Sequence, residues 1–192
     1  MPSAMVSQTV QGAVLSITSN VLAQFITSYK EETPFSLSFL PIFKFAVFSI
    51  ISNPPNIVWQ TFLEDVFPSN VPASPSETQL KDKPKPVQTR TSKRNTLAKF
   101  ILDQTIGAVL NTLMFLVYMS YANNTGAETT ASWDTVKADV SDKFWPMIID
   151  GYKFWPVVSL ASFLWVPVDK RVVFGCSVGV LWGIYLSLSV AG

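Results

Sequence analysis

The sequence of 192 residues contains no histidine and only one cysteine, Cys176. The lack of histidine excludes Ser-His and Cys-His nucleophilic pairs, histidine general bases and histidine-ligated metals. A single cysteine excludes an internal disulfide and a cysteine metal cluster. Chemistry based on carboxylates or lysine remains possible, but most enzyme classes are excluded. We therefore predict that the chain is not an enzyme and that it uses no metal and no cofactor.

Charge is also scarce. Charged residues make up 14% of the chain, against roughly 25% in an average soluble domain, while apolar residues make up 48%. A soluble fold of this size needs more charge to cover its surface. The net charge of +1 argues against a nucleic-acid partner, because such proteins normally carry a basic surplus on one face. The expected partner is therefore the lipid bilayer, with residues 1–192 forming a single membrane domain.

Long apolar runs support the expectation of a membrane protein. A bilayer core needs ~20 largely apolar residues in helical form, and such runs cover residues 10–28, 35–62, 97–121 and 172–190. A fifth run, 154–168, is shorter and interrupted by Pro156 and Pro167. We expect this run to cross the bilayer, to re-enter it or to lie at its surface. The predicted fold class is an all-α, multi-pass transmembrane helix bundle of four spans, with this proline-interrupted run as the candidate fifth.

Two polar segments separate these runs. Residues 69–95 are rich in Pro, Ser, Thr and Lys, and we predict a disordered, solvent-exposed basic loop. Residues 123–150 form the other sizeable polar stretch, which we predict to be an acidic loop. Basic residues near span ends stay on the cytosolic side, so the basic loop and the N-terminus are expected there. With four spans the C-terminus returns to that side, unless 154–168 also crosses. The basic residues concerned are Lys81, Lys83, Lys85, Arg90, Lys93, Arg94 and Lys99.

The first apolar run carries an unusual number of polar side chains. At 100° per residue, Asn20 and Gln24 fall on one narrow face together with small and hydroxylated residues. In lipid such a face must contact other helices or water, because each unpaired polar group in hydrocarbon costs several kcal/mol. It therefore either lines a pore or makes the interhelical hydrogen bonds that membrane bundles commonly use.

The third apolar run adds Asp103, Gln104 and Asn111 at helical spacing. Asp103 lies roughly 9 Å into the segment at ~1.5 Å per residue, where a carboxylate is costly and is a functional candidate by default. Lys99, one turn earlier, is the structural alternative as its partner. We predict that the Asn20–Gln24 face and this face enclose a shared polar core.

Two further features concern helix geometry. Pro54 and Pro55 in the second run remove two backbone donors, so a kink or break is expected there. Gly175, Gly179 and Gly183 form two consecutive Gly-x-x-x-Gly steps in the last run, a spacing that lets helix backbones approach closely. The partner is another span or another protomer, and we predict packing within the chain.

Near the C-terminus, Trp155-Pro156 is followed by Phe163, Pro167, Arg171, Trp182 and Tyr185-Leu186-Ser187. This pattern resembles the C-terminal signature of the peroxisomal membrane protein 22 kDa (Mpv/PMP) family of peroxisomal and mitochondrial inner-membrane proteins. The likeness extends upstream through Asp103-Gln104, and through Asn20 with Gln24. The residues that carry the family pattern are Pro54, Trp59, Trp155, Pro156, Phe163, Pro167, Arg171, Trp182, Tyr185, Leu186 and Ser187.

This resemblance implies a four-span organelle-membrane protein that forms, or contributes to, a non-selective or weakly selective channel for small solutes or metabolites. It implies no cofactor and no catalytic step, and its partners would be small solutes and, as alternatives, a homo-oligomer or membrane proteins. The second hypothesis is a scaffold or accessory role in organelle sorting or in a fungal biosynthetic pathway. A small intramembrane enzyme using Asp103 and a lysine is the third.

The chain departs from the family pattern at several polar positions. Ser159 and Ser162 stand where the family usually has Gln and Asn, Asn20 replaces an Asp, and Val109 replaces a Pro. If these positions line a pore, its lining is less charged than usual in the family.

Overall fold

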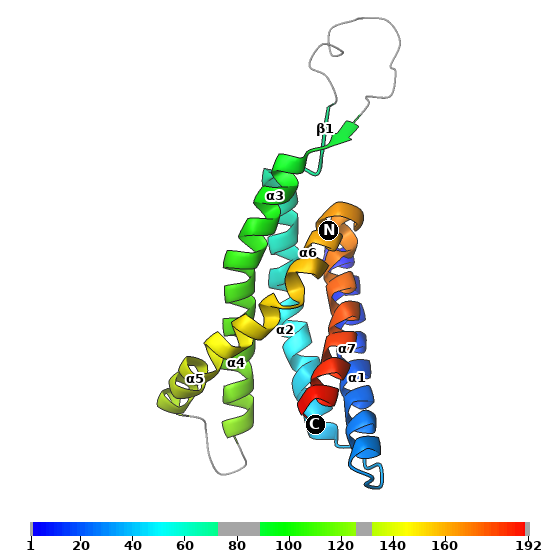
Figure 1. Ribbon diagram of the computed structural model, residues 1–192, viewed down its shortest axis with the longest axis vertical. Helices are drawn as coiled ribbons and strands as arrows, with labels where there is room; N and C mark the ends of the chain where they lie inside the picture. The colour runs from blue at the N-terminus through cyan, green and yellow to red at the C-terminus, as the bar shows by residue number, and fades with distance from the viewer. Residues whose placement is uncertain (1, 73–88, 126–131, 191–192) are drawn as a thin grey trace, which may run out of the picture.

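The computed structural model describes residues 2–72, 89–125 and 132–190, and almost all of this part of the chain is helical (Figure 1). The predicted all-α class is confirmed. The helices are α1 (Pro2–Lys30), α2 (Phe39–Val66), α3 (Lys93–Leu102), a π-helical segment (Asp103–Gly107), α4 (Ala108–Asn124), α5 (Trp133–Tyr152), α6 (Trp155–Trp165), a short 3-10 turn (Val168–Lys170) and α7 (Arg171–Val190).

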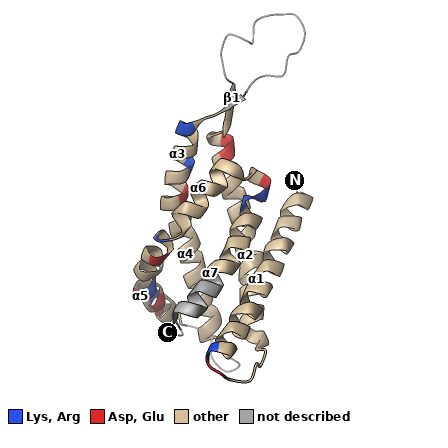
Figure 2. Cartoon of the chain, turned by 45° about the vertical axis from the view of Figure 1, so that its right-hand side comes forward, with Lys and Arg blue, Asp and Glu red and all other residues tan. Residues whose placement is uncertain are grey.

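The chain passes back and forth between the two ends of an elongated bundle (Figure 1). α1 packs against α2 and α7, while α3, the π-helical segment and α4 form one long rod whose far end packs against α5. α5 and α6 together bring the chain back to the starting end, and α7 then leaves it. The two termini therefore lie at opposite ends (Figure 2). Of the two alternatives that the sequence left open, the structure matches the one in which the proline-interrupted run contributes a further return, so the termini do not share an end.

Apolar side chains cover the outside of the bundle, and polar ones lie within it. Large hydrophobic residues such as Phe39, Phe43 and Val157 are 67–74% exposed, whereas Ser52, Asn53 and Lys99 are buried. Charged residues gather near the two ends and on α5 (Figure 2). This distribution reverses that of a water-soluble protein. It is the one expected when the surrounding solvent is hydrocarbon.

Among the described residues, two stretches are long and apolar enough to cross a membrane, Ser3–Lys30 and Lys93–Asn124. Only 6% of the most apolar window of each is buried within the bundle. The core helix of a soluble protein would instead be mostly buried. Both stretches contain a predicted span, the first and the third. The second and fourth predicted spans, and with them the total of four, stay a prediction.

Pro54 and Pro55 lie inside α2, which continues through both of them from Phe39 to Val66. The prolines therefore do not break the helix. Asn56, directly after them, donates from its side-chain amide to the carbonyl of Ser52 at 3.0 Å. The carbonyls that lose their donors are those of Ile50 and Ile51, four residues before each proline, so this bond adds a contact next to the weakened turn and does not replace a lost one.

The ends of the predicted basic loop are ordered. β1 (Asn70–Pro72) and β2 (Thr89–Thr91) pair as an antiparallel ribbon, with Val71 opposite Arg90. Ser92 then caps α3, its hydroxyl accepting a hydrogen bond from the Asn95 backbone N–H at 3.3 Å. Short regular elements therefore occupy residues 70–72, 89–91 and 93–95 at the ends of this segment. Residues 73–88 lie outside the described part, so the disorder predicted for them stays a prediction.

The acidic stretch is helical over most of its length. Ser132 caps α5 by accepting from the backbone N–H of Asp134, and Val136 and Ile148 are buried on one side of the helix. Asp139 ties α5 to the end of α4, because it accepts from the Ser120 hydroxyl at 2.6 Å. The acidic side chains had suggested a loop, but the buried side of α5 gives this segment a hydrophobic reason to be helical.

Candidate functional site

Asp103 is the centre of a hydrogen-bond network between three segments of the chain. Its Oδ1 accepts from Trp59 Nε1 at 3.1 Å and from Gln60 Nε2 at 3.1 Å, both on α2. Its Oδ2 accepts from the Ser159 hydroxyl of α6 at 2.6 Å. A carboxylate in an apolar helix thus obtains three donors in place of water, and hydrogen bonds to a charged group are among the stronger ones.

The backbone around Asp103 is adapted to this arrangement. Residues Asp103–Gly107 form a π-helical segment between α3 and α4, and the Tyr152 hydroxyl donates to the backbone carbonyl of Gln104 at 2.6 Å. A Cβ atom on Gly107 would lie 2.9 Å from Trp59 Nε1. Only glycine therefore leaves room for the indole to reach Asp103. Single π-helical turns inside α-helices occur frequently at functional sites.

Two amide oxygens beside this carboxylate are buried without a hydrogen-bond partner within the described structure. They are Oε1 of Gln60 and Oε1 of Gln104, and the Nε2 atoms of the same two side chains point to Asp103, at 3.1 and 3.5 Å. Each unpaired oxygen carries a free-energy cost of several kcal/mol in hydrocarbon. Water or a polar solute that donates hydrogen bonds would remove that cost.

The same interface between α2 and the α3–α4 rod carries further polar pairs. Asn56 and Asn111 exchange two amide hydrogen bonds of 3.2 Å, and Lys44 donates to the Asn123 side chain at 2.9 Å. Together, the pairs Glu64–Lys99, Gln60–Asp103, Asn56–Asn111 and Lys44–Asn123 make what we call the polar column.

A groove of about 900 Å³ runs alongside the polar column between α2 and α4. Asn56 and Asn111 contribute to its lining, together with the aromatic side chains of Trp59, Tyr118 and Tyr121. Its size is at the upper end of the range of small-molecule sites. The groove therefore places open space directly beside the middle of the polar column.

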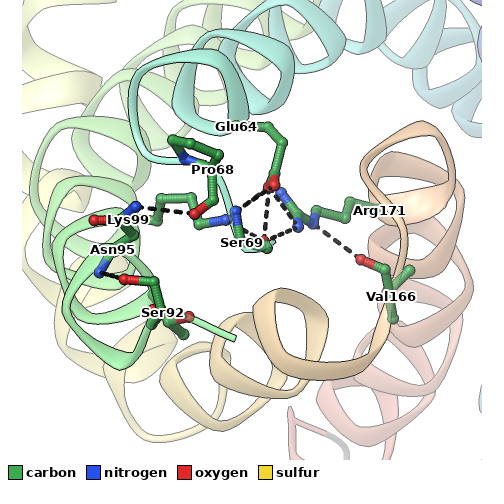
Figure 3. Close-up of polar contacts among 9 residues, drawn as sticks. Glu64, Pro68, Ser69, Ser92, Asn95, Lys99, Val166 and Arg171 are labelled. Carbon is green, nitrogen blue, oxygen red and sulfur yellow. Dashed lines mark hydrogen bonds and ion pairs between the residues drawn. The ribbon is translucent and has the colours of Figure 1, made fainter. Parts of the chain in front are cut away.

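The end of the polar column nearest the ribbon is a charged cluster (Figure 3). Glu64 Oε2 lies 2.6 Å from Lys99 Nζ and 2.8 Å from Arg171 Nη2, so one carboxylate holds two cations. The Ser69 hydroxyl donates to the same carboxylate at 3.0 Å. Both cations also face the ring of Phe163, at 5.5 and 5.0 Å from its centroid, a cation–π arrangement that favours desolvated charges.

This cluster corrects one sequence-based interpretation. Lys99 is completely buried and pairs with Glu64, so it is not the partner that compensates Asp103. Glu64 connects α2 to α3 and α7 through its two ion pairs. Burial raises the pKa of Glu64, but hydrogen bonds from Lys99, Ser69 and Arg171 outweigh this effect and lower the pKa to about 2.

Asn20 and Gln24 make their hydrogen bonds elsewhere. Gln24 donates to Asn20 Oδ1 at 2.8 Å, and its amide exchanges two bonds with the backbone of Ser38, of 2.9 and 2.8 Å. This pair therefore anchors the connection from α1 to α2. The structure brings together Asp103, Gln104 and their α2 partners, while the face of α1 lies against α2 and α7.

The glycine steps of α7 face open space at two positions. A Cβ atom on Gly175 or Gly179 would meet no atom within 4 Å, so the helix backbone has no close neighbour in that direction, and the packing within the chain stays a prediction. The surroundings of Gly183 lie outside the described residues. α7 packs with another face, where the Cys176 thiol approaches the side-chain oxygen of Asn53 at 3.7 Å.

The residues of the family pattern have structural roles where the structure describes them. Trp155 and Trp182 face one another with ring centroids 6.3 Å apart, which joins α6 to α7. Phe163 lies under the two cations of the charged cluster, and Pro167 precedes the turn into α7. The side chains of Tyr185, Leu186 and Ser187 lie outside the described residues.

The buried polar interior and the apolar exterior define this chain as an integral membrane protein built as a helix bundle. Residues 128–187 match the model of the Mpv17 / PMP22 family, which confirms the resemblance found in the sequence. No solved structure matches it.

Curated relatives agree with this assignment. The chain is 28% identical to PXMP2/4 family protein 3 of Dictyostelium discoideum over 92% of its length and 78% of the relative. It is 35% identical to the mitochondrial inner membrane protein Mpv17 of Rattus norvegicus, over 50% of the chain and 52% of the relative. It is 30% identical to the peroxisomal membrane protein PMP22 of Arabidopsis thaliana, over 47% and 45%.

Apart from the Dictyostelium protein, the chain spans about half the length of these relatives. Their names place them in the mitochondrial inner membrane and in the peroxisomal membrane. The chain is accordingly an organelle-membrane protein, as the resemblance to the family predicted.

Proposed function

We propose that this protein forms a weakly selective channel for small polar solutes in its organelle membrane, with the polar column as the lining of the path. The observation that carries the proposal is the extent of the column. It begins at Lys44 and ends at Glu64 of α2. At ~1.5 Å per residue this distance is about 30 Å, which matches the thickness of the hydrocarbon core.

Unpaired polar atoms beside the column support the same proposal. Helix packing alone is best served when every buried polar group has a partner. Gln60 and Gln104 instead leave their side-chain oxygens without one in the described structure. Oxygens of this kind can accept hydrogen bonds from water and from hydroxyl- or amide-bearing solutes in transit, replacing part of the hydration that those molecules lose.

Weak selectivity follows from the chemistry of the lining. The middle of the column combines one carboxylate, Asp103, with neutral amides and hydroxyls. Both ends carry an excess of positive charge, since Glu64 faces two cations and Lys44 pairs with the neutral amide of Asn123. Neutral hydrogen-bonding groups discriminate poorly between small polar molecules. The proposed function contains no chemical step, and the purified chain is expected to turn over no substrate.

Solute flux into liposomes tests the proposal. Vesicles that contain the purified protein should take up a small labelled polyol faster than empty vesicles do. Replacing the amide pair with apolar side chains in Asn56→Leu/Asn111→Leu should reduce that flux several-fold. The matched control is Thr18→Val, because Thr18 donates only to its own helix, to the carbonyl of Val14. Unchanged flux in the double variant would remove the column from the path.

A second candidate function is recruitment of a partner protein. The ribbon of β1 and β2 projects beyond the end of the bundle (Figure 1), and residues 73–88 connect its two strands in the sequence. Replacing those residues with an Asn-Gly turn, which favours a tight hairpin, should abolish recruitment and leave solute flux intact. Recruitment that survives the replacement would exclude this role for the segment.

A further inference from the structure

A second pocket lies apart from the polar column, at the end of the bundle where α1 begins. It has a volume of about 510 Å³ and is formed by the first turns of α1 and the start of α7. Ser7 and Gln8 line it from α1, and Asp169, Lys170 and Ser177 line it from the other side. The rest of the lining is largely apolar, and Val166 and Phe174 contribute to it.

Gln8 is the buried polar member of this lining. Gln8 is only 9% exposed. Its side-chain Oε1 has no hydrogen-bond partner within the described structure. A buried acceptor without a donor costs about 1–3 kcal/mol. The pocket therefore contains an acceptor that a bound molecule with an N–H or O–H group would satisfy.

Two residues of opposite charge line the same pocket as Gln8. Asp169 and Lys170 are adjacent in sequence and exposed, and both line the pocket. Neither takes part in an ion pair among the described residues. The pocket thus offers a negative group, a positive group and a neutral acceptor to one ligand.

The depth of the pocket indicates where such a ligand would come from. Gln8 comes just before the first predicted span, 10–28, and Lys170 just before the last, 172–190. Both helices therefore enter the bilayer at the level of the pocket, which is the level of the lipid headgroups. Apolar residues such as Val173 and Phe174 complete the wall, as expected for a molecule with an apolar portion.

We propose that this pocket binds a zwitterion that has a primary ammonium group and an anionic group, as in an ethanolamine phosphate. The ammonium donates to Gln8 Oε1 and lies toward Asp169, while the phosphate lies toward Lys170. The source is either the headgroup of a phosphatidylethanolamine or the free phosphoethanolamine. The proposal does not depend on the channel function.

The chemistry of Gln8 makes the proposal specific. A neutral amide oxygen accepts one hydrogen bond without the desolvation cost of a buried carboxylate. A primary ammonium supplies such a donor, whereas the trimethylammonium group of choline has no N–H. The pocket should therefore discriminate between two lipids of equal net charge. Losing one buried hydrogen bond corresponds to about a tenfold loss of affinity.

The test is native mass spectrometry of the purified full chain with phosphatidylethanolamine or phosphatidylcholine in mixed micelles. The expected result is about tenfold tighter retention of phosphatidylethanolamine. Gln8→Leu should abolish the preference without unfolding the protein, because it replaces an unpaired polar group with an apolar one. Asp169→Asn should weaken binding as well, and Asp142→Asn, an exposed acid on α5, should leave it unchanged.

The outcomes separate the two sources of the ligand. Retention of the lipid that depends on Gln8 supports the headgroup as the ligand. Binding of soluble phosphoethanolamine by lipid-free protein, measured by calorimetry and lost in Gln8→Leu, supports the free molecule. Two results would overturn the proposal. One is equal retention of both lipids with no calorimetric signal, and the other is binding that Gln8→Leu does not change. Solute flux is measured separately, so failure of either proposal is recognisable.

Discussion

Lys99 and Glu64 are 35 residues apart in sequence and form an ion pair of 2.6 Å in which the lysine side chain is completely buried. Arg171, which begins α7, adds a second cation to the same carboxylate at 2.8 Å. Three separate segments are thus held together at one end of the bundle by a single acid. The structure of this end depends on that acid more than on either cation.

Removing the charge of Glu64 should be strongly destabilising. Glu64→Gln leaves two buried cations without their counter-ion, and breaking a buried pair in this way costs about 3–5 kcal/mol. For a chain of this size the thermal midpoint in detergent should fall by about 6–20 °C. Asp65→Asn is the matched control, since Asp65 is the exposed neighbour on α2. A midpoint that is equal in both variants would contradict the role of the cluster.

The same residue predicts the pH dependence of stability. The pKa of Glu64 is lowered from 4.5 to about 2, so the folded protein favours the ionised form. The stabilisation is complete above the unfolded-state pKa and is lost as the pH falls from about 4.5 to about 2. The difference in thermal midpoint between wild type and Glu64→Gln should therefore be constant from pH 7 to pH 5 and shrink below that range. A difference that stays constant down to pH 2 would be inconsistent with this pKa.

Gly107 should tolerate no side chain, in contrast to the glycines of α7. A Cβ atom at Gly107 would lie 2.9 Å from Trp59 Nε1 and 3.2 Å from Asp103 Oδ1. Gly107→Ala must displace the indole, at a cost of about 1–3 kcal/mol, and tryptophan fluorescence should shift. Gly179→Ala is the control, because nothing lies within 4 Å of the added atom. Equal stability of the two variants would mean that the indole does not need this approach.

The helical class was predictable from the sequence, and Asp103 was recognisable as an unusual residue. A low charge content and apolar runs of about 20 residues identify a membrane bundle, and a carboxylate deep in such a run is conspicuous. The donors to Asp103 were not predictable, because Gln60 and Ser159 lie 43 and 56 residues away from it. Hydrogen bonds at that separation depend on how the helices pack, which one sequence does not show.

The charged cluster was missed although a signal existed. Lys99 lies at the start of an apolar run, and Glu64 lies at the end of another, so both belong to the same end of the bundle in a multi-pass arrangement. Pairing them required combining topology with charge. The assignment of 123–150 to a loop failed for a different reason, since its acidic residues obscured the buried positions Val136 and Ile148. Asn20 and Gln24 lie on one helix face in the sequence pattern, but in the structure they anchor the connection from α1 to α2.

The central claim is that the polar column lines a path for solutes, and single-channel recording in planar bilayers tests it most directly. The wild-type protein should conduct, and Asp103→Asn should change the conductance or its ion preference, because the variant removes the only charge in the middle of the column. Asp142→Asn removes an equal charge on α5 and should conduct like wild type. Currents of the same size and selectivity in Asp103→Asn, with insertion confirmed, would contradict the account.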